Sequence, residues 1–234
     1  MNIAIIPARG GSKRIPRKNI KEFVGKPMIA WSIEAAKASR LFEHIIVSTD
    51  DKEIAEIAQQ CGAEVPFMRP MKLSDDYVGT GAVIKHAVEW VINNFGELDL
   101  ICTIYATAPF ITPADIINGL ALLMKSSAEI AFTVTSFSFP IQRAIRITNE
   151  GRVAMFQPEH FLTRSQDLEH AYHDAGQFYW ATKNAVLNEI SAFSDAAIPI
   201  ILPRCQVQDI DTLEDWQRAE LMFKVWHENI PVSI

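Results

Sequence analysis

The chain has 234 residues, of which 49% are hydrophobic and 21% are charged. This length and composition predict one ordered globular domain over residues 1–234, and they exclude a largely disordered chain. Its 22 basic and 28 acidic residues leave a net charge of −6, which disfavours nucleic acid as a partner.

The N-terminal segment MNIAIIPARGG has neither the basic region nor the long apolar run of a signal peptide. No later stretch approaches the ~18 apolar residues of a membrane span. We therefore expect a cytoplasmic protein with no membrane partner. The three cysteines lie far apart and form no CxxC pair, so the sequence indicates neither a disulfide framework nor a zinc site.

Short apolar segments alternate with helical patterns through the first 136 residues. Because strand and helix follow one another repeatedly, we expect a three-layer α/β fold in which helices cover both faces of a mostly parallel sheet. The apolar segments predict strands at 2–7, 44–49, 64–68, 98–106 and 130–136. Helices are expected from Pro27, from a capping box of Asp50 and Glu53 to Gly62, over residues 80–95, and from Thr112 and Pro113.

The helical pattern fades after residue 136 and gives way to short β-like and polar segments. We expect residues 137–168 to form a β-rich arm that protrudes from the sheet or packs against another subunit. Residues 198–202 are expected to return to the sheet. An amphipathic helix over residues 212–226 is then expected to end the fold.

A cationic, glycine-rich loop follows the first predicted strand, with the sequence ARGGSKRIPRKN at residues 8–19. Gly10 and Gly11 lie at the carboxyl end of that strand, where backbone N–H groups of an α/β fold can face a phosphate. The spacing matches neither the ATPase P-loop nor the dinucleotide fingerprint. The alternative is a solvated basic turn. The cations that could neutralise a triphosphate are Arg9, Lys13, Arg14, Arg17 and Lys18.

Two carboxylates near the end of the chain, Asp209 and Asp211, stand at i and i+2. In extended backbone they point to the same side, as two ligands of one divalent cation would, and hard oxygen ligands of this kind suit Mg²⁺. Asp211 with Glu214 also fits a capping box for the last helix. Both interpretations of Asp211 stay open, and they do not exclude each other.

Several motifs resemble the CMP-sialic acid synthetase family of cytidylyltransferases, and they occur in the order found in that family. The resemblance spans nearly the whole chain and is strongest in IPARGGSKRIPRKN. The matching positions are residues 6–19, Arg69-Pro70, Leu73, Asp76, Thr80, residues 107–109, residues 164–168 and residues 209–211.

The resemblance implies a nucleotide-diphospho-sugar transferase fold and transfer of CMP from CTP to a nine-carbon 2-keto sugar acid, a nonulosonic acid, with Mg²⁺. It also implies a homodimer in which the arm of each subunit reaches its neighbour. Residues 104–110, 139–144 and 172–180 are most similar to the branch that uses pseudaminic acid. Sialic, legionaminic and Kdo acids are the alternative sugars. Tyr105 stands where the sialic acid enzymes usually have glutamine, which disfavours N-acetylneuraminic acid.

The resemblance also assigns roles to individual residues. Catalytic roles fall on Arg9, Lys18, Asp209 and Asp211, with the two aspartates as metal ligands. Nucleotide contacts are expected from Ala8, Arg9, Gly10, Gly11, Ser12, Lys18, Asn19, Arg69 and Thr80. Sugar contacts are expected from Tyr105, Gln142, Arg143, Arg164, His173, Gln177 and Tyr179.

Two points stay open at this level. His173 could serve as a general base or a sugar hydrogen-bond donor, or it could be structural. A non-catalytic nucleotide sensor would need the basic loop but not the two aspartates.

Overall fold

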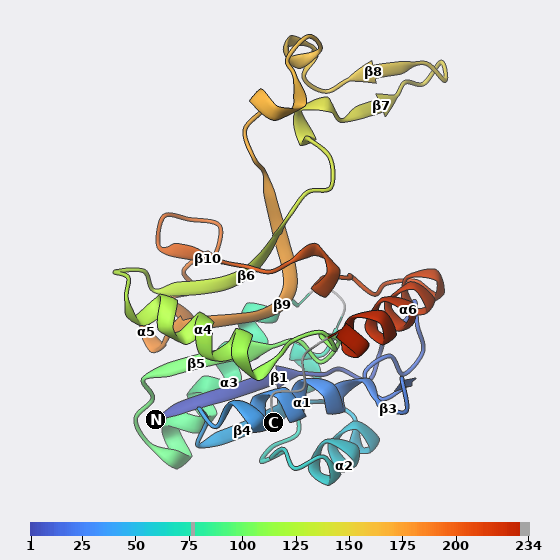
Figure 1. Ribbon diagram of the computed structural model, residues 1–234. Helices are drawn as coiled ribbons and strands as arrows, with labels where there is room; N and C mark the ends of the chain where they lie inside the picture. Colours follow the sequence, from blue (N-terminus) through green and yellow to red (C-terminus); the bar gives the residue numbers. More distant parts are fainter. Residues whose placement is uncertain (76–77, 230–234) are drawn as a thin grey trace.

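The computed structural model describes residues 1–75 and 78–229. A six-stranded sheet with the order β10-β6-β9-β5-β1-β4 forms its centre (Figure 1). Strand β1 runs parallel to β4 and β5, and β10 runs parallel to β6, whereas β9 is antiparallel to both of its neighbours. The strands are β1 (Asn2–Pro7), β4 (His44–Ser48), β5 (Leu100–Ile104), β6 (Ile130–Ser136), β9 (Tyr172–Thr182) and β10 (Ala197–Ile201). The predicted mostly parallel sheet is confirmed.

Helices cover both faces of the sheet, which confirms the three layers. Side chains of β1 alternate between the faces: Ala4 and Ile6 pack with α1, α2 and α4, whereas Ile3 and Ile5 pack with α3. Helix α5 lies on the α3 side, against β6 and β9. The helices are α1 (Met28–Ser39), α2 (Lys52–Gln60), α3 (Thr80–Phe95), α4 (Pro113–Met124), α5 (Lys183–Leu187) and α6 (Leu213–Asn229).

Helix α6 joins the end of the chain to its beginning. It packs on the small hairpin of β2 (Glu22–Phe23) and β3 (Lys26–Pro27), which follows the glycine-rich loop. The ring of Phe23 meets Trp216 and Phe223 edge-on, each with centroids 5.5 Å apart. Because residues 209–211 lie immediately before α6, this packing brings the late aspartates to the basic loop.

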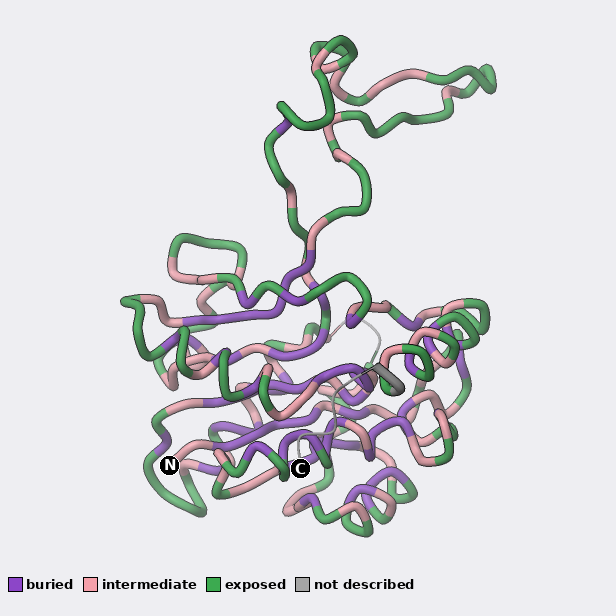
Figure 2. The backbone as a smooth tube through the Cα atoms, in the orientation of Figure 1, coloured by how far each residue is buried: buried purple, intermediate pink, exposed green. Residues whose placement is uncertain are grey.

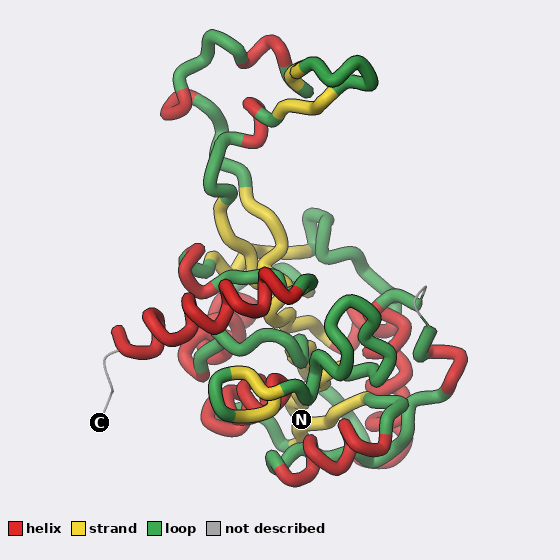
Figure 3. Tube along the Cα trace, turned by 90° about the vertical axis from the view of Figure 1, so that its right-hand side faces the viewer, coloured by secondary structure: helices red, strands yellow, loops and turns green. Residues whose placement is uncertain are grey.

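Residues 137–171 leave the sheet between β6 and β9 and project well away from it (Figure 1). Figure 3 shows the same projection from the side, and Figure 2 shows that most of its backbone is exposed. Its regular structure is one hairpin, β7 (Ile145–Ile147) with β8 (Val153–Met155), and three single turns of 3₁₀-helix. The expected arm, 137–168, lies within this protrusion, and its role in dimerisation stays a prediction.

Both expected capping boxes are wrong by one residue. Helix α2 is capped by Asp51, whose side chain accepts from the Ile54 N–H, because the Asp50 carboxylate accepts instead from the Gly10 N–H at 2.9 Å. At the start of α6, Thr212 Oγ1 accepts from the Asp215 N–H at 3.1 Å while the Asp215 carboxylate accepts from the Thr212 N–H at 2.8 Å. Asp211 is therefore not the capping residue.

Other boundaries also differ from the prediction. Residues 64–68 make only isolated bridges, at Glu64 and Met68, and form no strand. Pro27 is the N-cap of α1 and not a residue of its first turn. By contrast, β1, α3, β6 and the start of α4, with Thr112 as the cap and Pro113 at the first position, agree with the prediction.

The sequence analysis did not predict β9 or α5. Strand β9 lies in the middle of the sheet, yet its sequence YHDAGQFYWAT has no clear two-residue alternation. Its pairing with β6 shifts register between Phe132 and Val134, opposite Gly176, which has a φ of +60°. A β-bulge of this kind breaks the alternation, and this explains the missed strand. Among the described residues, no helix is long and apolar enough to cross a membrane.

Candidate active site

A cleft of about 610 Å³ opens where β1 and β5 end. Its floor consists of residues that follow β5, and Arg69 and Thr80 line one side. The glycine-rich loop contributes the largest set of lining side chains, namely Arg9, Ser12, Lys13, Arg14, Lys18 and Asn19. Ligand sites of α/β sheets form at this edge, and the volume is typical of a small-molecule site.

The loop is held in place by carboxylates that follow β4. Asp50 accepts from the Gly10 N–H at 2.9 Å, and Arg17 pairs with both Asp51 and Glu53, the latter at 2.5 Å. The pair with Arg17 holds the pKa of Asp51 below its ordinary value. Arg17 itself has a φ of +57° and turns away from the cleft. We conclude that Arg17 positions the loop and does not line the cleft.

The two glycines of the loop have different surroundings. A Cβ built at Gly10 would lie 2.6 Å from Asp51 Oδ2 and 2.9 Å from Asp51 Cβ. Gly11 has nothing within 4 Å of such a Cβ. Gly10 is thus required by the close approach of the loop to Asp51, whereas Gly11 leaves open backbone at the surface. Ala8 is buried behind the loop, with its N–H bonded to the Ser48 carbonyl at 2.9 Å.

Buried polar side chains form the inner wall of the cleft. Asn19 is buried, and its amide nitrogen donates to the Arg9 carbonyl at 2.9 Å. Arg69 is only 6% exposed, and its guanidinium donates to both the hydroxyl and the carbonyl of Ser48. Burial lowers the pKa of Arg69, and the Asp50 carboxylate opposes that shift. This wall is therefore rigid and carries fixed hydrogen-bonding groups.

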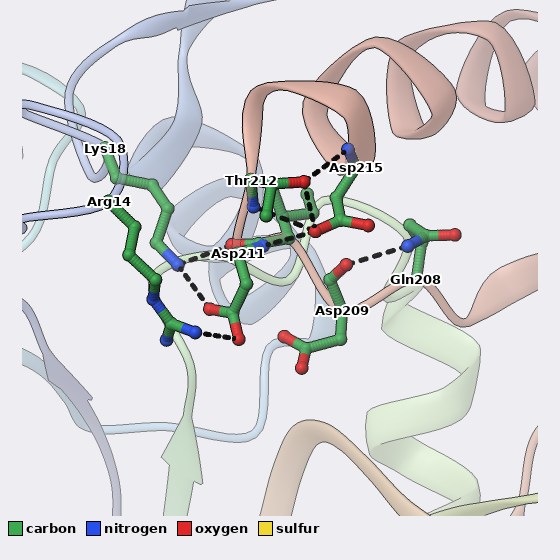
Figure 4. Close-up of polar contacts among 8 residues, drawn as sticks. Arg14, Lys18, Gln208, Asp209, Asp211, Thr212 and Asp215 are labelled. Atoms are coloured by element: carbon green, nitrogen blue, oxygen red, sulfur yellow. Dashed lines mark hydrogen bonds and ion pairs between the residues drawn. The ribbon is translucent and has the colours of Figure 1, made fainter. Parts of the chain in front are cut away.

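Lys18 and Arg14 connect the loop to the late acidic segment (Figure 4). Lys18 Nζ donates to the Ile210 carbonyl at 2.5 Å and lies 3.5 Å from Asp211 Oδ1. Arg14 Nη1 lies 2.6 Å from Asp211 Oδ2. Residues almost 200 positions apart in the chain thus meet at one edge of the cleft. The structure places the cationic loop and the aspartates together.

Asp209 lies beside Asp211 (Figure 4). Burial raises the pKa of Asp209, and the neighbouring Asp211 carboxylate raises it further, while Lys18 and Arg14 act in the opposite direction. The same paired carboxylates could hold a divalent cation, because a bound cation would relieve this repulsion. Within residues 1–75 and 78–229 no group of three or more His, Cys, Asp or Glu residues gathers as a metal site.

A second hollow of about 320 Å³ adjoins the cleft on the α3 side of the sheet. Thr80 and Tyr105 line both spaces. The Tyr179 ring stacks on Phe132, with centroids 5.5 Å apart and an interplanar angle of 9°. Most of the other lining side chains are apolar, including Ile84, Ile130, Ala181, Val186, Ile190 and Phe193.

The residues expected to contact a sugar fall into two groups. Tyr105 and Tyr179 lie at the apolar hollow, and Gln177 is buried nearby, with its carbonyl bonded to the Tyr105 N–H at 2.8 Å. His173 lies at the base of the protrusion, where its ring contacts Phe137 and its Nδ1 is 2.9 Å from the Asp174 carbonyl.

The second group lies on the protrusion and has local partners only. Gln142 donates to the Glu169 carbonyl at 3.0 Å, and Arg143 donates to the Thr163 carbonyl at 2.5 Å. Arg164 pairs with Asp167 at 2.6 Å. Within one chain, the structure does not bring these three residues to the cleft.

Sequence reasoning missed four carboxylates around the site. Asp50 and Asp51 position the loop, and their place directly after the strand at 44–48 was an available signal. Asp75 lines the cleft and accepts from Arg9 through its carbonyl at 3.3 Å. Asp174 accepts from the Tyr179 hydroxyl. Asp76, part of the resemblance, lies outside the described residues.

Comparisons with known proteins agree with this arrangement. A model of the cytidylyltransferase family matches residues 3–217. A pseudaminic acid cytidylyltransferase from Campylobacter jejuni is 44% identical over 97% of this chain and 98% of that protein. A CMP-N,N'-diacetyllegionaminic acid synthase from Legionella pneumophila is 34% identical over 97% of each chain.

A solved structure of CMP:2-keto-3-deoxy-manno-octonic acid synthetase complexed with CTP shares the fold. Its TM-score is 0.69 at 17% identity, over 96% of this chain and 99% of that one. The resemblance that the sequence motifs indicated is confirmed. The full-length matches show that this chain belongs to the cytidylyltransferase family.

Proposed function

We propose that this protein transfers CMP from CTP to the anomeric hydroxyl of pseudaminic acid and releases pyrophosphate. The observation that carries the proposal is the contact of two cations that line the cleft, Arg14 and Lys18, with Asp211 of the late acidic segment. A relative of this chain, 44% identical over nearly its full length, bears the name of that activity. Because CTP is a cytoplasmic nucleotide, we place the reaction in the cytoplasm.

The nucleotide half of the reaction uses the basic loop. Arg9 and Lys18 neutralise the triphosphate, and Lys18 stabilises the α-phosphate as pyrophosphate leaves. The anomeric hydroxyl of the sugar loses its proton to water and its oxygen forms a bond to the α-phosphorus, while the bond from that phosphorus to the β-bridging oxygen breaks and pyrophosphate leaves. Positioning and charge neutralisation supply most of the acceleration in such a displacement.

The buried wall of the cleft would recognise the cytidine. Asn19 and Arg69 are fixed by hydrogen bonds to the backbone of neighbouring segments. Thr80 begins α3 and faces the same space. Rigid polar groups of this kind hydrogen-bond a base without losing side-chain freedom on binding.

Asp209 and Asp211 would hold Mg²⁺. Burial and the neighbouring Asp211 carboxylate raise the pKa of Asp209, and two adjacent carboxylates of this kind fit a hard cation. Mg²⁺ commonly takes only one or two protein carboxylates beside phosphate oxygens and water. The bound ion would supply charge neutralisation at the phosphates. Lys18 and Arg14, which contact Asp211, would turn to the phosphates when the cation neutralises that carboxylate.

The mainly apolar hollow beside the cleft favours a sugar acid with a terminal methyl group over sialic acid. Pseudaminic acid carries two acylated amines and a terminal methyl group, whereas sialic acid carries a hydroxylated tail. The part of the space lined by Ile84, Ile130 and Val186 accepts methyl groups and offers hydroxyl groups no partner. Tyr105, at the boundary of the two spaces, contacts both substrates in this proposal.

The sugar half of the site would be completed by a second copy of the chain. The protrusion carries a set of large apolar side chains that one chain leaves exposed, and burial of such a set favours association. Arg143 and Arg164 of the partner subunit would then reach the sugar carboxylate. The exposed apolar residues are Phe139, Ile145, Ile147, Val153, Phe156, Phe161 and Leu162.

The experiment is a panel of sugar acids with CTP and Mg²⁺, read by pyrophosphate release. We expect turnover with pseudaminic acid to exceed that with legionaminic, sialic and Kdo acids by at least tenfold in kcat/KM, and CTP to exceed ATP, GTP and UTP. A preference for legionaminic acid would replace the sugar assignment, and the 34% identical relative makes it the strongest alternative. Binding of CTP without turnover of any sugar would show that the protein is a nucleotide sensor and not this enzyme.

A further inference from the structure

A row of hydrogen-bonding side chains separates the nucleotide cleft from the apolar hollow. Thr80 and Tyr105 line both spaces, and Tyr179 lines the hollow. The rings of Tyr105 and Tyr179 lie 5.9 Å apart. The Tyr179 hydroxyl donates to Asp174 Oδ2. The row therefore ends on a carboxylate that the reaction itself does not use.

Asp174 is held firmly enough to serve as the fixed end of this row. Its other oxygen, Oδ1, accepts from the Gly176 N–H at 2.7 Å. Gly176 has a φ of +60°, a conformation that other residues rarely adopt, and it lies at the bulge of β9. Both oxygens of Asp174 are thus engaged, one by the bulge and one by Tyr179.

The Tyr179 ring has little freedom apart from its hydroxyl. It stacks on Phe132, and it is paired in register with Thr103 on one side of β9 and with Phe132 on the other. Burial, Asp174 and Tyr105 all raise the pKa of Tyr179, while burial raises the pKa of Tyr105. Both hydroxyls consequently stay protonated at neutral pH and act as hydrogen-bond donors.

We propose that Asp174 is a positioning residue for sugar specificity: it anchors the Tyr179 hydroxyl and thereby fixes the Tyr105–Tyr179 wall that limits the apolar hollow. This inference rests on the proposed function for the identity of the sugar. With the wall fixed, the hollow accepts a methyl-terminated, acylated sugar acid. Without Asp174, the Tyr179 hydroxyl loses its acceptor and turns to water or to a hydroxyl group of a competing sugar.

The test compares Asp174→Asn, Tyr179→Phe and the double variant. We expect each single variant to raise the KM for pseudaminic acid about tenfold, the size of one lost buried hydrogen bond to a charged group, with the KM for CTP unchanged. Because both changes break the same contact, the double variant should cost no more than the larger single one. Discrimination against the hydroxylated analogue, sialic acid, should fall in all three variants.

A matched control is Tyr172→Phe, which removes a half-exposed hydroxyl at the start of the same strand. It should leave both KM values and the discrimination unchanged. An equal rise of the KM for CTP and for the sugar in Asp174→Asn, or fully additive losses in the double variant, would show a general structural role and overturn the proposal.

A second measurement separates this inference from the proposed function. In protein labelled with ¹³C at the tyrosine ring, Asp174→Asn should shift the resonances of Tyr179 and Tyr105 and leave that of Tyr172 in place. Unmoved Tyr179 and Tyr105 signals would overturn the positioning role whatever the substrate. Shifted signals in a protein that turns over none of the sugar acids would support the anchored wall and refute the proposed reaction.

Discussion

The nucleotide cleft and the protrusion differ in where their polar side chains find partners. In the cleft, partners come from distant parts of the chain: Lys18 meets Asp211, and Arg69 meets Ser48. On the protrusion, Arg164 pairs with Asp167, three residues away, and remains largely exposed. Partners from other elements fix the cleft within one chain, whereas the described partners of Arg143 and Arg164 lie on the protrusion itself.

The difference fits the proposed function, in which the site has two unequal halves. The half for CTP would be complete within one chain because the sheet edge and α6 bring its parts together. The half for the sugar would use the apolar hollow, and a second copy would supply the cation for the substrate carboxylate. Changes in the cleft should therefore act on every step, and changes on the protrusion should act on the sugar alone.

The largest effect is expected from Asp209→Asn. Loss of one of the two carboxylates proposed to hold Mg²⁺ should lower kcat by roughly 10²–10³-fold, the size typical of one lost electrostatic stabiliser. Since burial and Asp211 raise the pKa of Asp209, the neutral side chain should leave thermal stability equal or higher. Pyrophosphate release measures kcat, and thermal unfolding measures stability. Glu56→Gln, an exposed change on α2, is the control, and a loss of stability in step with activity would contradict the assignment.

The next effect is expected from Arg164→Ala. Removing the proposed partner of the sugar carboxylate should raise the KM for the sugar acid by about 10–100-fold, because a charge-assisted hydrogen bond is lost. Calorimetry should show unchanged binding of CTP. Arg152→Ala, an exposed change at the turn of the protruding hairpin, should alter neither quantity. A weaker affinity for CTP in Arg164→Ala would mean that the two halves are not separate.

Gly10→Ala and Gly11→Ala should distinguish a glycine needed for packing of the loop from one that only contacts the ligand. A Cβ at Gly10 meets Asp51, so we expect a loss of about 1–3 kcal/mol in unfolding free energy and weaker CTP binding together. A Cβ at Gly11 meets nothing, so stability should stay within about 0.5 kcal/mol of the wild type while CTP binding weakens. Denaturant unfolding measures the stability of both variants, and calorimetry measures their CTP binding. Equal destabilisation by both changes would refute the distinction.

The smallest effect is expected from Asp51→Asn, which keeps an N-cap residue and removes the charge that pairs with Arg17. The cost at neutral pH should be below about 1 kcal/mol, because the pair is partly exposed. Arg17 lowers the folded-state pKa of Asp51. The stabilisation is therefore complete above the unfolded-state pKa near 3.8 and is lost as the pH falls through the lower folded-state value. Stability curves of wild type and variant should converge in acid, and a constant gap would exclude this linkage.

Several elements were predictable because their signals are local. Strands β1 and β6 are continuous apolar runs, α3 has regular helical spacing, and α4 begins with Thr112 and Pro113. The two capping boxes were misplaced by one residue because neighbouring side chains of similar chemistry compete for the cap. Asp50 does not cap α2 because its carboxylate accepts from the distant Gly10 N–H, and a local sequence pattern cannot predict such a contact.

The candidate site shows the same limit. The basic loop and Asp209–Asp211 were visible as motifs, and the packing of α6 on Phe23 brings them together. Strand β9 escaped prediction because the bulge at Gly176 interrupts its alternation. Asp174 was not predicted as a site residue because its contact with the Tyr179 hydroxyl crosses that bulge. Residues of the protrusion could be named from the sequence, but the structure of one chain does not bring Gln142, Arg143 and Arg164 to the cleft.

The most direct test is complementation between two impaired variants, assayed at a sugar concentration well below the wild-type KM. Asp209→Asn damages the cleft and leaves the protrusion intact, whereas Arg164→Ala does the reverse. If the protrusion of one subunit completes the site of the other, a mixed and refolded equimolar sample should recover roughly a quarter of wild-type turnover, since half of the dimers then hold one intact site of two. Turnover that stays at the level of the two separate variants would show that each chain works alone and would contradict the divided site.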